Sequence, residues 1–419
     1  MSTNATRAAM HDARTLPPPD PDAAAHSAHL ARAIAAHIGE QGGSIPFSRF
    51  MELALYAPGL GYYSAGATKF GRAGDFVTAP ELGQVFAACV ATAIAPVLQQ
   101  VGPSARVLEL GGGSGAFAEV ALMRLLELDA LPDRYAILEP SADLRERQRE
   151  RLQRSLAPPQ FARVEWLDGP FDDDWDGVLF ANEVIDALPT PRFALRDGEV
   201  YEEHVVVRHD AVVLPRDDAS ALPQPGFAIE LRPADAFLSQ SVRHVERTLG
   251  HALPDGMRSE VLPQLPYWIQ AVAGGLRRGA MLFVDYGHPR SERYADDKPD
   301  GTLRAFARHR VHSDVLRWPG LQDITASVDF TALAESGVHA GFDLAGYCTQ
   351  ASFLIGNGLP DALQRIEAIA DAGERTQRLA EVKQLTLPSE MGERFGVMGF
   401  EKDVVFEAAF PAGDLAWRL

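Results

Sequence analysis

The sequence predicts an α/β fold whose core is a mostly parallel sheet with helices between its strands. From about residue 105 onward, short apolar runs alternate with helical stretches, as they do in βαβ units. A glycine-rich turn joins the first apolar run, residues 106–110, to the helical stretch at residues 116–128. With 46% hydrophobic residues over 419 positions, the chain can bury a large core.

Five apolar runs are predicted to form the sheet. They lie at residues 106–110, 135–139, 163–167, 177–181 and 280–285. The insertion before the fifth run has hairpin-like patterns at residues 193–200 and 203–214. Near the C-terminus, residues 395–400 and 404–408 flank a short polar segment, as the two strands of an antiparallel hairpin do.

Composition excludes several kinds of partner. The net charge of −18 repels phosphate backbones, so no nucleic-acid partner is expected. No apolar run reaches the length of about 18 residues that a membrane span needs, so no membrane insertion is expected. Cys89 and Cys348 are too few for a disulfide framework, which indicates a reducing compartment such as the cytoplasm.

The turn after the first strand is typical of a nucleotide site. Gly111, Gly113 and Gly115 place backbone N–H groups where a nucleoside has to come close, and residues without a Cβ permit that approach. Together with Ala116, the same string also fits the dinucleotide pattern Gly-x-Gly-x-x-Ala. Spacing therefore leaves the choice of cofactor open.

Two carboxylates beside the turn favour one cofactor. Glu109 ends the first strand, where a carboxylate repels a pyrophosphate but attracts the ammonium and sulfonium groups of S-adenosylmethionine. Glu139 ends the second strand and is placed to accept hydrogen bonds from both ribose hydroxyls. We therefore expect S-adenosylmethionine to bind Glu109, Glu139 and the three glycines. The alternative is that Glu109 merely closes a strand.

Polar residues also follow the fourth strand. In a doubly wound sheet this position lies beside the transferable group of the ligand, so Asn182, Glu183 and Asp186 are expected to face the substrate. The alternative is a helix N-cap followed by acids that face solvent. Asp285, at the end of the fifth strand, has the same position in the sheet.

Seven segments in a fixed order complete the pattern. They are Gly-Tyr-Tyr at 61–63, Gly-Asp-Phe-Val-Thr-Ala-Pro-Glu at 74–81, the glycine turn at 107–115, Asn-Glu-Val-Ile-Asp-Ala-Leu-Pro at 182–189, Asp-Tyr-Gly at 285–287, Gly-Thr-Leu-Arg at 301–304 and Gln-Asp-Ile-Thr-Ala at 322–326. In this set the chain resembles the MidA-like S-adenosylmethionine-dependent methyltransferases over residues 28–410. Two positions depart from the family: Ala87 stands where relatives commonly have glycine, and Ser327 where bacterial relatives often have histidine.

The resemblance implies a class I methyltransferase fold, which is Rossmann-like, with an added N-terminal helical part and a large insertion before the fifth strand. It also implies protein arginine methylation, since mitochondrial relatives methylate an arginine of a respiratory complex I subunit during assembly. The expected partner is therefore a protein substrate such as a complex I subunit. The chain is expected to be a monomer or homodimer, cytoplasmic in a bacterium or in the mitochondrial matrix of a eukaryote.

Arginine methylation predicts a cluster of acids. Deprotonating a guanidinium at pH 7 costs about 8 kcal/mol, taking a pKa near 13 and about 1.36 kcal/mol per unit. Carboxylates avoid this cost because they localise the positive charge on the nitrogens that do not react. We call this cluster of carboxylates around the guanidinium the clamp. Its catalytic candidates are Glu183, Asp186 and, from the Gly-Asp-Phe loop, Asp75. Asn182 is expected to hold the cofactor's amino group or the target nitrogen.

Other functions stay open on the sequence. An NAD(P)-dependent oxidoreductase fits the glycine spacing, and a catalytically silent assembly factor would bind the cofactor without turnover. A small-molecule methyltransferase is a third alternative, but the insertion is large for a metabolite lid. His309 and His312 lack an accompanying cluster of carboxylates or cysteines, so no metal is expected.

The predicted organisation has five segments. They are a disordered, proline-rich tail (1–25), an N-terminal helical and loop region that contributes to the active site (26–100), the cofactor-binding half of the sheet domain (101–189), an insertion that binds substrate (190–265), and the remainder of the sheet domain (266–419). The helix of the second segment is indicated by the spacing of Leu30, Ile34 and Ile38.

Overall fold

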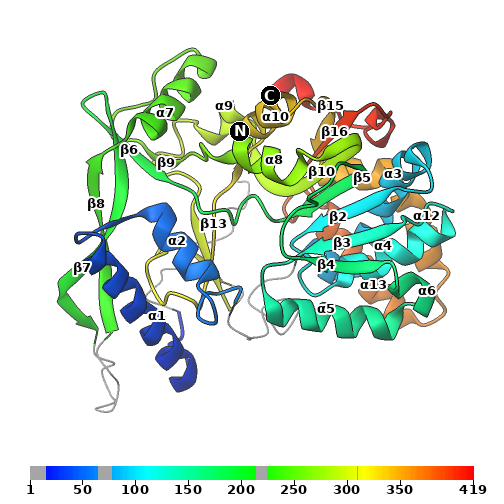
Figure 1. The fold of residues 1–419 in the computed structure, drawn as a ribbon, viewed down its shortest axis with the longest axis horizontal. Coiled ribbons are helices and arrows are strands. Elements are labelled where there is room, and N and C mark those ends of the chain that lie inside the picture. Colours follow the sequence, from blue (N-terminus) through cyan, green and yellow to red (C-terminus); the bar gives the residue numbers. More distant parts are fainter. Residues whose placement is uncertain (1–15, 65–77, 214–223, 309) are drawn as a thin grey trace. The chain divides into compact units, whose positions relative to one another are not determined.

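The structure is a computed structural model that describes residues 16–64, 78–213, 224–308 and 310–419 (Figure 1). The chain forms two compact units. The first unit comprises Met1–Phe76, Asp186–Pro263 and Arg290–Ser327, and the second comprises Val77–Ile185, Gln264–Pro289 and Val328–Leu419. The five-segment organisation inferred from the sequence stays a prediction.

The second unit is built on an eight-stranded sheet with the order β15-β16-β10-β5-β2-β3-β4, and β14 pairs with β10. The strands are β2 (Arg106–Leu110), β3 (Arg134–Leu138), β4 (Val164–Leu167), β5 (Trp175–Asn182), β10 (Leu276–His288), β14 (Val328–Asp329), β15 (Asp343–Thr349) and β16 (Phe395–Lys402). Strands β10, β5, β2, β3 and β4 are parallel neighbours, whereas β16 is antiparallel to β10 and β15. The predicted mostly parallel sheet is confirmed.

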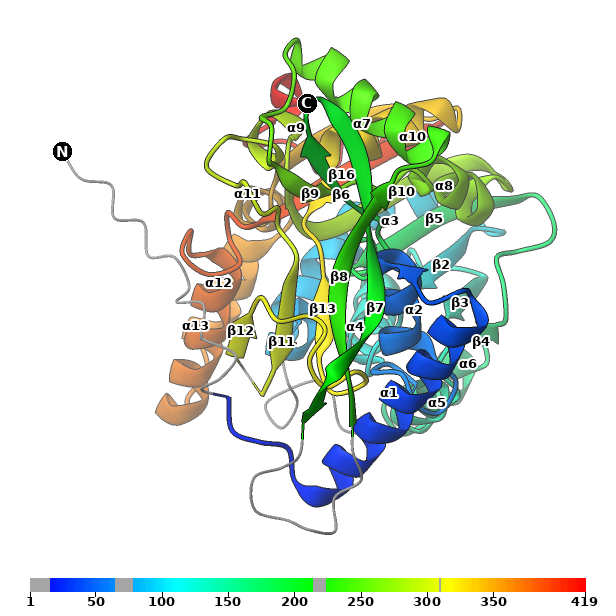
Figure 2. The same ribbon diagram turned by 90° about the vertical axis from the view of Figure 1, so that its left-hand side faces the viewer.

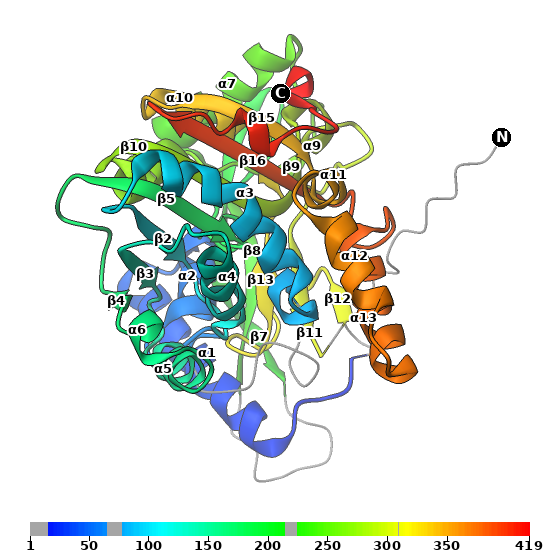
Figure 3. The ribbon, with the colours of Figure 1, turned by 90° about the vertical axis from the view of Figure 1, so that its right-hand side faces the viewer.

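Helices cover this sheet, and two of them lie together over one face (Figure 3). Those two are α3 (Val85–Val101) and α4 (Ala116–Glu127). The other helices of the unit are η2 (Ala79–Leu82), α5 (Ala142–Ser155), α6 (Pro158–Phe161), α8 (Leu265–Ala273), α10 (Phe330–His339), α11 (Gln350–Gly356), α12 (Leu359–Glu367), α13 (Ala372–Thr386), η3 (Glu407–Ala409) and η4 (Ala416–Arg418).

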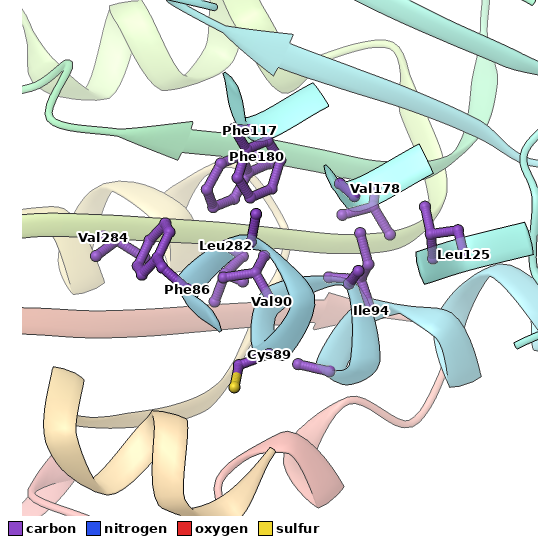
Figure 4. Packing of buried hydrophobic residues seen from close by; sticks show 14 of the residues in the cluster. Phe86, Cys89, Val90, Ile94, Phe117, Leu125, Val178, Phe180, Leu282 and Val284 are labelled. Atoms are coloured by element: carbon purple, nitrogen blue, oxygen red, sulfur yellow. The ribbon is translucent and has the colours of Figure 1, made fainter. Parts of the chain in front are cut away.

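Aromatic side chains hold α4 against the sheet (Figure 4). Phe117 of α4 stacks on Phe180 of β5 with ring centroids 4.1 Å apart, and Phe86 of α3 meets Phe117 edge-on at 6.3 Å. All three rings are buried. Such pairs contribute about 0.5–1.5 kcal/mol beyond the apolar area they bury, so the turn between β2 and α4 has a rigid base.

The first unit contains a five-stranded antiparallel sheet with the order β1-β7-β6-β9, in which β8 also pairs with β7. Its strands are β1 (Ile45–Pro46), β6 (Arg192–Arg196), β7 (Glu199–Val213), β8 (Gln224–Pro233) and β9 (Arg258–Glu260). A three-stranded sheet joins β12 (Arg310–His312), β11 (Arg304–Ala307) and β13 (Asp323–Thr325). The helices are α1 (Pro21–Glu40), α2 (Phe47–Tyr56), α7 (Ala236–Leu249) and α9 (Arg290–Arg293). Figure 2 shows α1 beside the long β7–β8 ribbon.

The hairpin in the insertion turns earlier than the apolar pattern predicts. Strands β6 and β7 are joined by Asp197 and Gly198, whose φ angles are +52° and +77°. An Asp-Gly pair adopts these left-handed angles at low cost and matches the twist of a two-residue hairpin. The predicted boundary near residues 201–202 was therefore wrong, since Tyr201 and Glu202 pair within β7 with β6.

Buried ion pairs organise the interior of the first unit. Arg192 contacts Glu203 at 2.8 Å and Glu260 at 3.2 Å, and both carboxylates are fully buried. Glu260 also accepts the N–H of Thr302 over 2.9 Å. Burial by itself would raise the pKa of Glu260, but Arg192, Arg293 and Thr302 outweigh that effect and lower it. Removing one partner from such a pair costs about 3–5 kcal/mol, so this network fixes the Gly-Thr-Leu-Arg segment.

Two predicted boundaries change at the ends of the chain. Helix α1 begins at Pro21, inside the predicted tail, because Asp20 accepts the N–H of Ala23 as N-cap and proline suits the first helical turn. An antiparallel terminal pair is present, but β16 pairs with β15 and, on its other side, with β10. Residues 404–408 do not pair: Asp403 has a φ of +55° and turns the chain, so that buried Phe406 packs on Phe410. Among the described residues, no helix has both the length and the apolar character of a membrane span.

Candidate active site

The ends of the parallel strands place the predicted site residues on one edge of the sheet. In the register of the second unit, Leu110 of β2 lies opposite both Leu138 of β3 and Ala181 of β5. Asn182 at the end of β5 lies opposite Val284 of β10. The residues at these strand ends therefore lie at the same edge, which is where ligands bind in open parallel sheets.

The glycine turn leaves space beside its backbone. Gly111, Gly113 and Gly115 have φ angles of +68°, +53° and +81°, and Gly115 is the N-cap of α4. A Cβ at Gly113 would meet no atom within 4 Å, whereas one at Gly112 would approach Ile137 to 2.7 Å. The turn thus packs on the sheet at Gly112 and is open at Gly113. Open backbone at a helix N-terminus suits a bound nucleoside.

Glu109 is a buried carboxylate that has a neutral partner. Its side chain is 3% exposed, and Oε2 accepts a hydrogen bond from the hydroxyl of Tyr135 over 2.8 Å. Burial raises the pKa of Glu109 to about 7, with a further increase from the charge of Glu139 and an opposing effect from Tyr135. A cation that binds beside Glu109 would favour the ionised form of this carboxylate and lower its pKa.

Glu139 is held toward the same turn. Its carboxylate accepts the N–H of Ser141 over 3.0 Å and Nε2 of Gln148 over 3.3 Å, and Nε2 of Gln148 also donates to the carbonyl oxygen of Gly113 over 2.9 Å. Burial raises the pKa of Glu139 to about 7, against the lowering effect of Ser141 and Gln148. Gln148 therefore joins the ribose-binding candidate to the glycine turn.

Asn182 and Glu183 meet at the end of β5. Nδ2 of Asn182 donates to Oε1 of Glu183 over 3.1 Å. Oδ1 of Asn182 is buried and accepts no hydrogen bond from the described residues. Leaving a buried acceptor unsatisfied costs about 1–3 kcal/mol, so this oxygen is suited to receive a donor from a ligand.

The backbone at Glu183 is strained. Its φ of +54° lies in the left-handed region, which L side chains adopt at a cost of about 1–3 kcal/mol. The N–H of Glu183 donates to the carbonyl oxygen of Val284 over 2.9 Å, and the N–H of Ile185 donates to Oδ2 of Asp285 over 3.0 Å. Asp285 thus fixes the turn in which Glu183 lies. No helix follows β5, so the N-cap alternative was wrong.

Of the other two clamp candidates, the structure describes only Asp186, which belongs to the first unit. Asp186 is 5% exposed, and its carbonyl oxygen accepts the N–H of Ala326 over 2.9 Å. It follows Glu183 by three positions in the chain. Asp75 lies outside the described residues. The structure therefore brings Asn182 and Glu183 into direct contact and buries Asp186 within the first unit.

One contact to the glycine turn was not predicted. Ser114, inside the turn, donates its hydroxyl hydrogen to Oε1 of Glu81, and Arg151 of α5 donates to Oγ of Ser114 over 3.1 Å. Glu81 is the last residue of the Gly-Asp-Phe-Val-Thr-Ala-Pro-Glu segment. Its place in that segment was a signal, but nothing in the sequence indicates that it reaches Ser114. Nor does the sequence indicate the hydrogen bond from Tyr135 to Glu109, or those from Gln148 to Glu139 and Gly113.

These residues fit S-adenosylmethionine. Two buried acids with raised pKa values suit a ligand with an ammonium, a sulfonium and a ribose diol, whereas they would repel a pyrophosphate. The open backbone at Gly113 and the unsatisfied oxygen of Asn182 leave room and an acceptor. Glu109, Glu139 and the three glycines would hold this cofactor.

Comparison with known proteins gives the same cofactor. Residues 89–348 match a family described as "Putative S-adenosyl-L-methionine-dependent methyltransferase". Protein arginine methyltransferase NDUFAF7, mitochondrial, of Danio rerio is 29% identical over 395 residues, which cover 88% of this chain and 84% of that protein. The Homo sapiens protein of the same name is 27% identical over 84% of this chain and 79% of its own length.

A solved structure is also similar. A protein from Burkholderia thailandensis, crystallised with S-adenosyl-homocysteine, shares 39% sequence identity with this chain at a TM-score of 0.86. The match covers 97% of this chain and 100% of that one. The fold is thus the Rossmann-like fold of S-adenosylmethionine-dependent methyltransferases, and S-adenosyl-L-methionine is the cofactor. The nicotinamide alternative is set aside.

Proposed function

The chain belongs to this family of S-adenosyl-L-methionine-dependent methyltransferases, and we propose that it methylates an arginine side chain of a protein, with a subunit of respiratory complex I as its target. The names of the curated relatives support the arginine substrate. The large insertion, with its long β7–β8 ribbon, supports a protein substrate over a metabolite. The compartments that fit are the bacterial cytoplasm and the mitochondrial matrix.

The observation that carries this proposal is the pairing of Asn182 with Glu183 at the end of β5. When bound, the cofactor supplies a methyl group that carries positive charge from its sulfonium. A guanidinium is a poor nucleophile because its lone pairs are delocalised, and a carboxylate that accepts two of its N–H groups localises its charge. We assign this role to Glu183.

The remaining site residues are assigned by position. Oδ1 of Asn182, which is buried and unsatisfied, would accept an N–H of the target nitrogen or of the cofactor's amino group and orient it. Asp186 and Asp75 are proposed as the other carboxylates of the clamp. Asp285 positions Glu183 through the turn and is not itself expected to touch the substrate.

Methyl transfer to arginine is tested with the full-length chain. Tritiated S-adenosylmethionine is added to a cell extract with the purified protein, and the labelled proteins are hydrolysed to amino acids. We expect the label in methylated arginine. Glu183→Gln is expected to reduce the label about 10²-fold, the scale for losing one charged group that stabilises a reaction. The matched control Glu127→Gln, an exposed acid at the end of α4, is expected to keep it.

Other results would contradict the proposal. Label in another amino acid, or label that Glu183→Gln leaves unchanged, contradicts the assigned substrate or the assigned residue. Cofactor binding without transfer to any protein supports the silent assembly factor. In that case, Glu183→Gln would still rescue a complex I assembly defect.

A further inference from the structure

Three of the sequence segments meet inside the first unit. Tyr56 and Tyr63 lie at the end of α2 and in the Gly-Tyr-Tyr segment, Asp186 and Ala187 follow β5, and Asp323 begins β13. The proposed clamp includes only Asp186 from this group. The other side chains have no role in the site described so far.

Hydrogen bonds connect all three segments. The hydroxyl of Tyr63 donates to Oδ1 of Asp323 over 2.8 Å, and the hydroxyl of Tyr56 donates to the carbonyl oxygen of Ala187 over 2.9 Å. The carbonyl oxygen of Asp186 accepts the N–H of Ala326, the residue after β13, over 2.9 Å. Asp186 and the strand that carries Asp323 are therefore fixed to each other through backbone and to the two tyrosines through side chains.

Both carboxylates are buried, and both act on one phenol. Asp186 is 5% exposed and Asp323 is 4% exposed, whereas the two tyrosines are only partly buried. Burial raises the pKa of Tyr63 well above its usual value, and the charges of Asp323 and then of Tyr56 and Asp186 raise it further. Two negative charges near one phenol favour a cation at this position.

The aromatic rings add a shape requirement. The rings of Tyr56 and Tyr63 are stacked, with centroids 5.5 Å apart and planes 22° apart. Aromatic faces beside carboxylates recognise cations. A guanidinium fits such a site better than an ammonium, since it is planar, stacks on rings and offers paired N–H donors to a carboxylate.

We infer that Asp323, positioned by Tyr63, is a substrate-binding residue that receives the guanidinium of the target arginine together with Asp186, with the paired tyrosine rings selecting its planar shape. This inference rests on the proposed arginine methylation and names the residues that recognise the substrate. Asp323 and Tyr63 belong to segments that the cofactor site does not use.

Binding of short peptides tests the inference without methyl transfer. The probes are acetyl-Gly-Arg-Gly-amide, its citrulline counterpart, which is neutral and of nearly the same shape, and its lysine counterpart. Each is titrated calorimetrically into the full-length protein saturated with S-adenosyl-homocysteine. We expect the arginine peptide to bind at least about tenfold more tightly than either of the others, which corresponds to about 1.4 kcal/mol.

The variants separate recognition from structure. Asp323→Asn is expected to abolish the arginine preference, and Asp323→Glu to restore part of it. Tyr63→Phe keeps the ring and is expected to reduce the preference, and Tyr63→Leu to remove the discrimination against lysine. The affinity for S-adenosyl-homocysteine is expected to stay unchanged in all four variants. The matched control is Asp255→Asn, an exposed carboxylate of the same unit, which is expected to behave as the wild type.

Three results would overturn the inference: a wild-type protein without an arginine preference, an Asp323→Asn variant that keeps it, and an Asp323→Asn variant that loses affinity for S-adenosyl-homocysteine to the same extent. The last result assigns Asp323 a structural role. Different results would refute the proposed function and this inference. Methylarginine in the extract with an unaffected Asp323→Asn variant refutes only the inference, and an intact arginine preference without methylarginine refutes only the activity.

Discussion

Tyr135 donates its hydroxyl hydrogen to Oε2 of Glu109 over 2.8 Å, and both side chains are buried. The residues lie on the neighbouring parallel strands β3 and β2. This hydrogen bond opposes the increase in the pKa of Glu109 that burial causes. The ionisation of Glu109, which is expected to bind the cofactor, therefore depends on the hydroxyl of Tyr135.

Replacing Tyr135 with phenylalanine is expected to weaken cofactor binding. Without the hydroxyl, the pKa of Glu109 increases above about 7, and less of the carboxylate is ionised at neutral pH. One pKa unit corresponds to about 1.4 kcal/mol, so we expect an affinity loss of up to about tenfold at pH 7 and a smaller loss at pH 8.5. Titration calorimetry with S-adenosylmethionine measures both. Tyr267→Phe, at a position that is 68% exposed, is the control; an equal loss at both pH values would contradict the explanation.

Cofactor binding is expected to release protons near neutral pH. Burial raises the pKa values of Glu109 and Glu139 to about 7 in the cofactor-free protein, so both are partly protonated there. A bound cation favours the ionised form and lowers these pKa values, so affinity increases as pH rises through 7. Calorimetry at pH 7 in phosphate and in Tris, which differ in protonation heat, counts the protons. Equal heats in the two buffers would contradict the prediction.

The same shifts mean that Glu109 and Glu139 contribute less to the stability of the cofactor-free protein at neutral pH than at acidic pH. An acid whose pKa is raised by folding stays protonated in the native state while the unfolded chain ionises. The contribution to stability is therefore lost as pH rises from the unfolded pKa, near 4.5, to the folded pKa, about 7. We expect the increase in Tm that S-adenosylmethionine causes to be larger at pH 8 than at pH 6. Glu109→Gln is expected to reduce this difference, as thermal scans can measure.

The left-handed backbone at Glu183 is expected to reduce the free energy of unfolding. Its φ of +54° suits glycine, so Glu183→Gly relieves backbone strain that Glu183→Ala retains. We expect the glycine variant to be more stable than the alanine variant by about 1 kcal/mol, and both to lose methyl transfer. Denaturant unfolding measures the difference. Equal stability of the two variants would show that the angle stores no strain.

A substitution at Gly113 is expected to weaken cofactor binding while the protein still folds. An added methyl group at Gly113 meets no protein atom within 4 Å, although its φ of +53° makes alanine cost about 1–2 kcal/mol. We expect Gly113→Ala to fold and to bind S-adenosyl-homocysteine at least about tenfold more weakly. Gly198→Ala is the control, since Gly198 also has a positive φ and an open Cβ position but lies in the hairpin turn of the first unit. Equal affinity in both variants would place the cofactor elsewhere.

Local sequence patterns were sufficient for the elements that carry the cofactor site. The apolar runs predicted β2, β3, β4, β5 and β10, because the strands of a buried parallel sheet are apolar on both faces. The glycines at 111, 113 and 115 predicted the turn, because their left-handed angles exclude most other residues. Polar residues at strand ends predicted which side chains share the edge of the sheet, because parallel strands end together.

Contacts between segments far apart in the chain could not be predicted from such local patterns. Strand β16 pairs with β15, although three helices separate the two strands in the chain, and it pairs with β10 on its other side. The predicted partner, residues 404–408, was wrong. The hydrogen bonds from Tyr135 to Glu109 and from Tyr63 to Asp323 join residues that no local spacing connects.

The sequence by itself determined the secondary structure around the cofactor turn, the acids beside it and the kind of cofactor they suit, because each of these depends on neighbouring residues and on charge. Only the tertiary structure decided which phenol supports which carboxylate, that Glu183 lies in a strained turn fixed by Asp285, and that Asp323 lies near Asp186. These relationships depend on strand order and packing between segments far apart in the chain, and a side chain's identity does not specify them until the chain has folded.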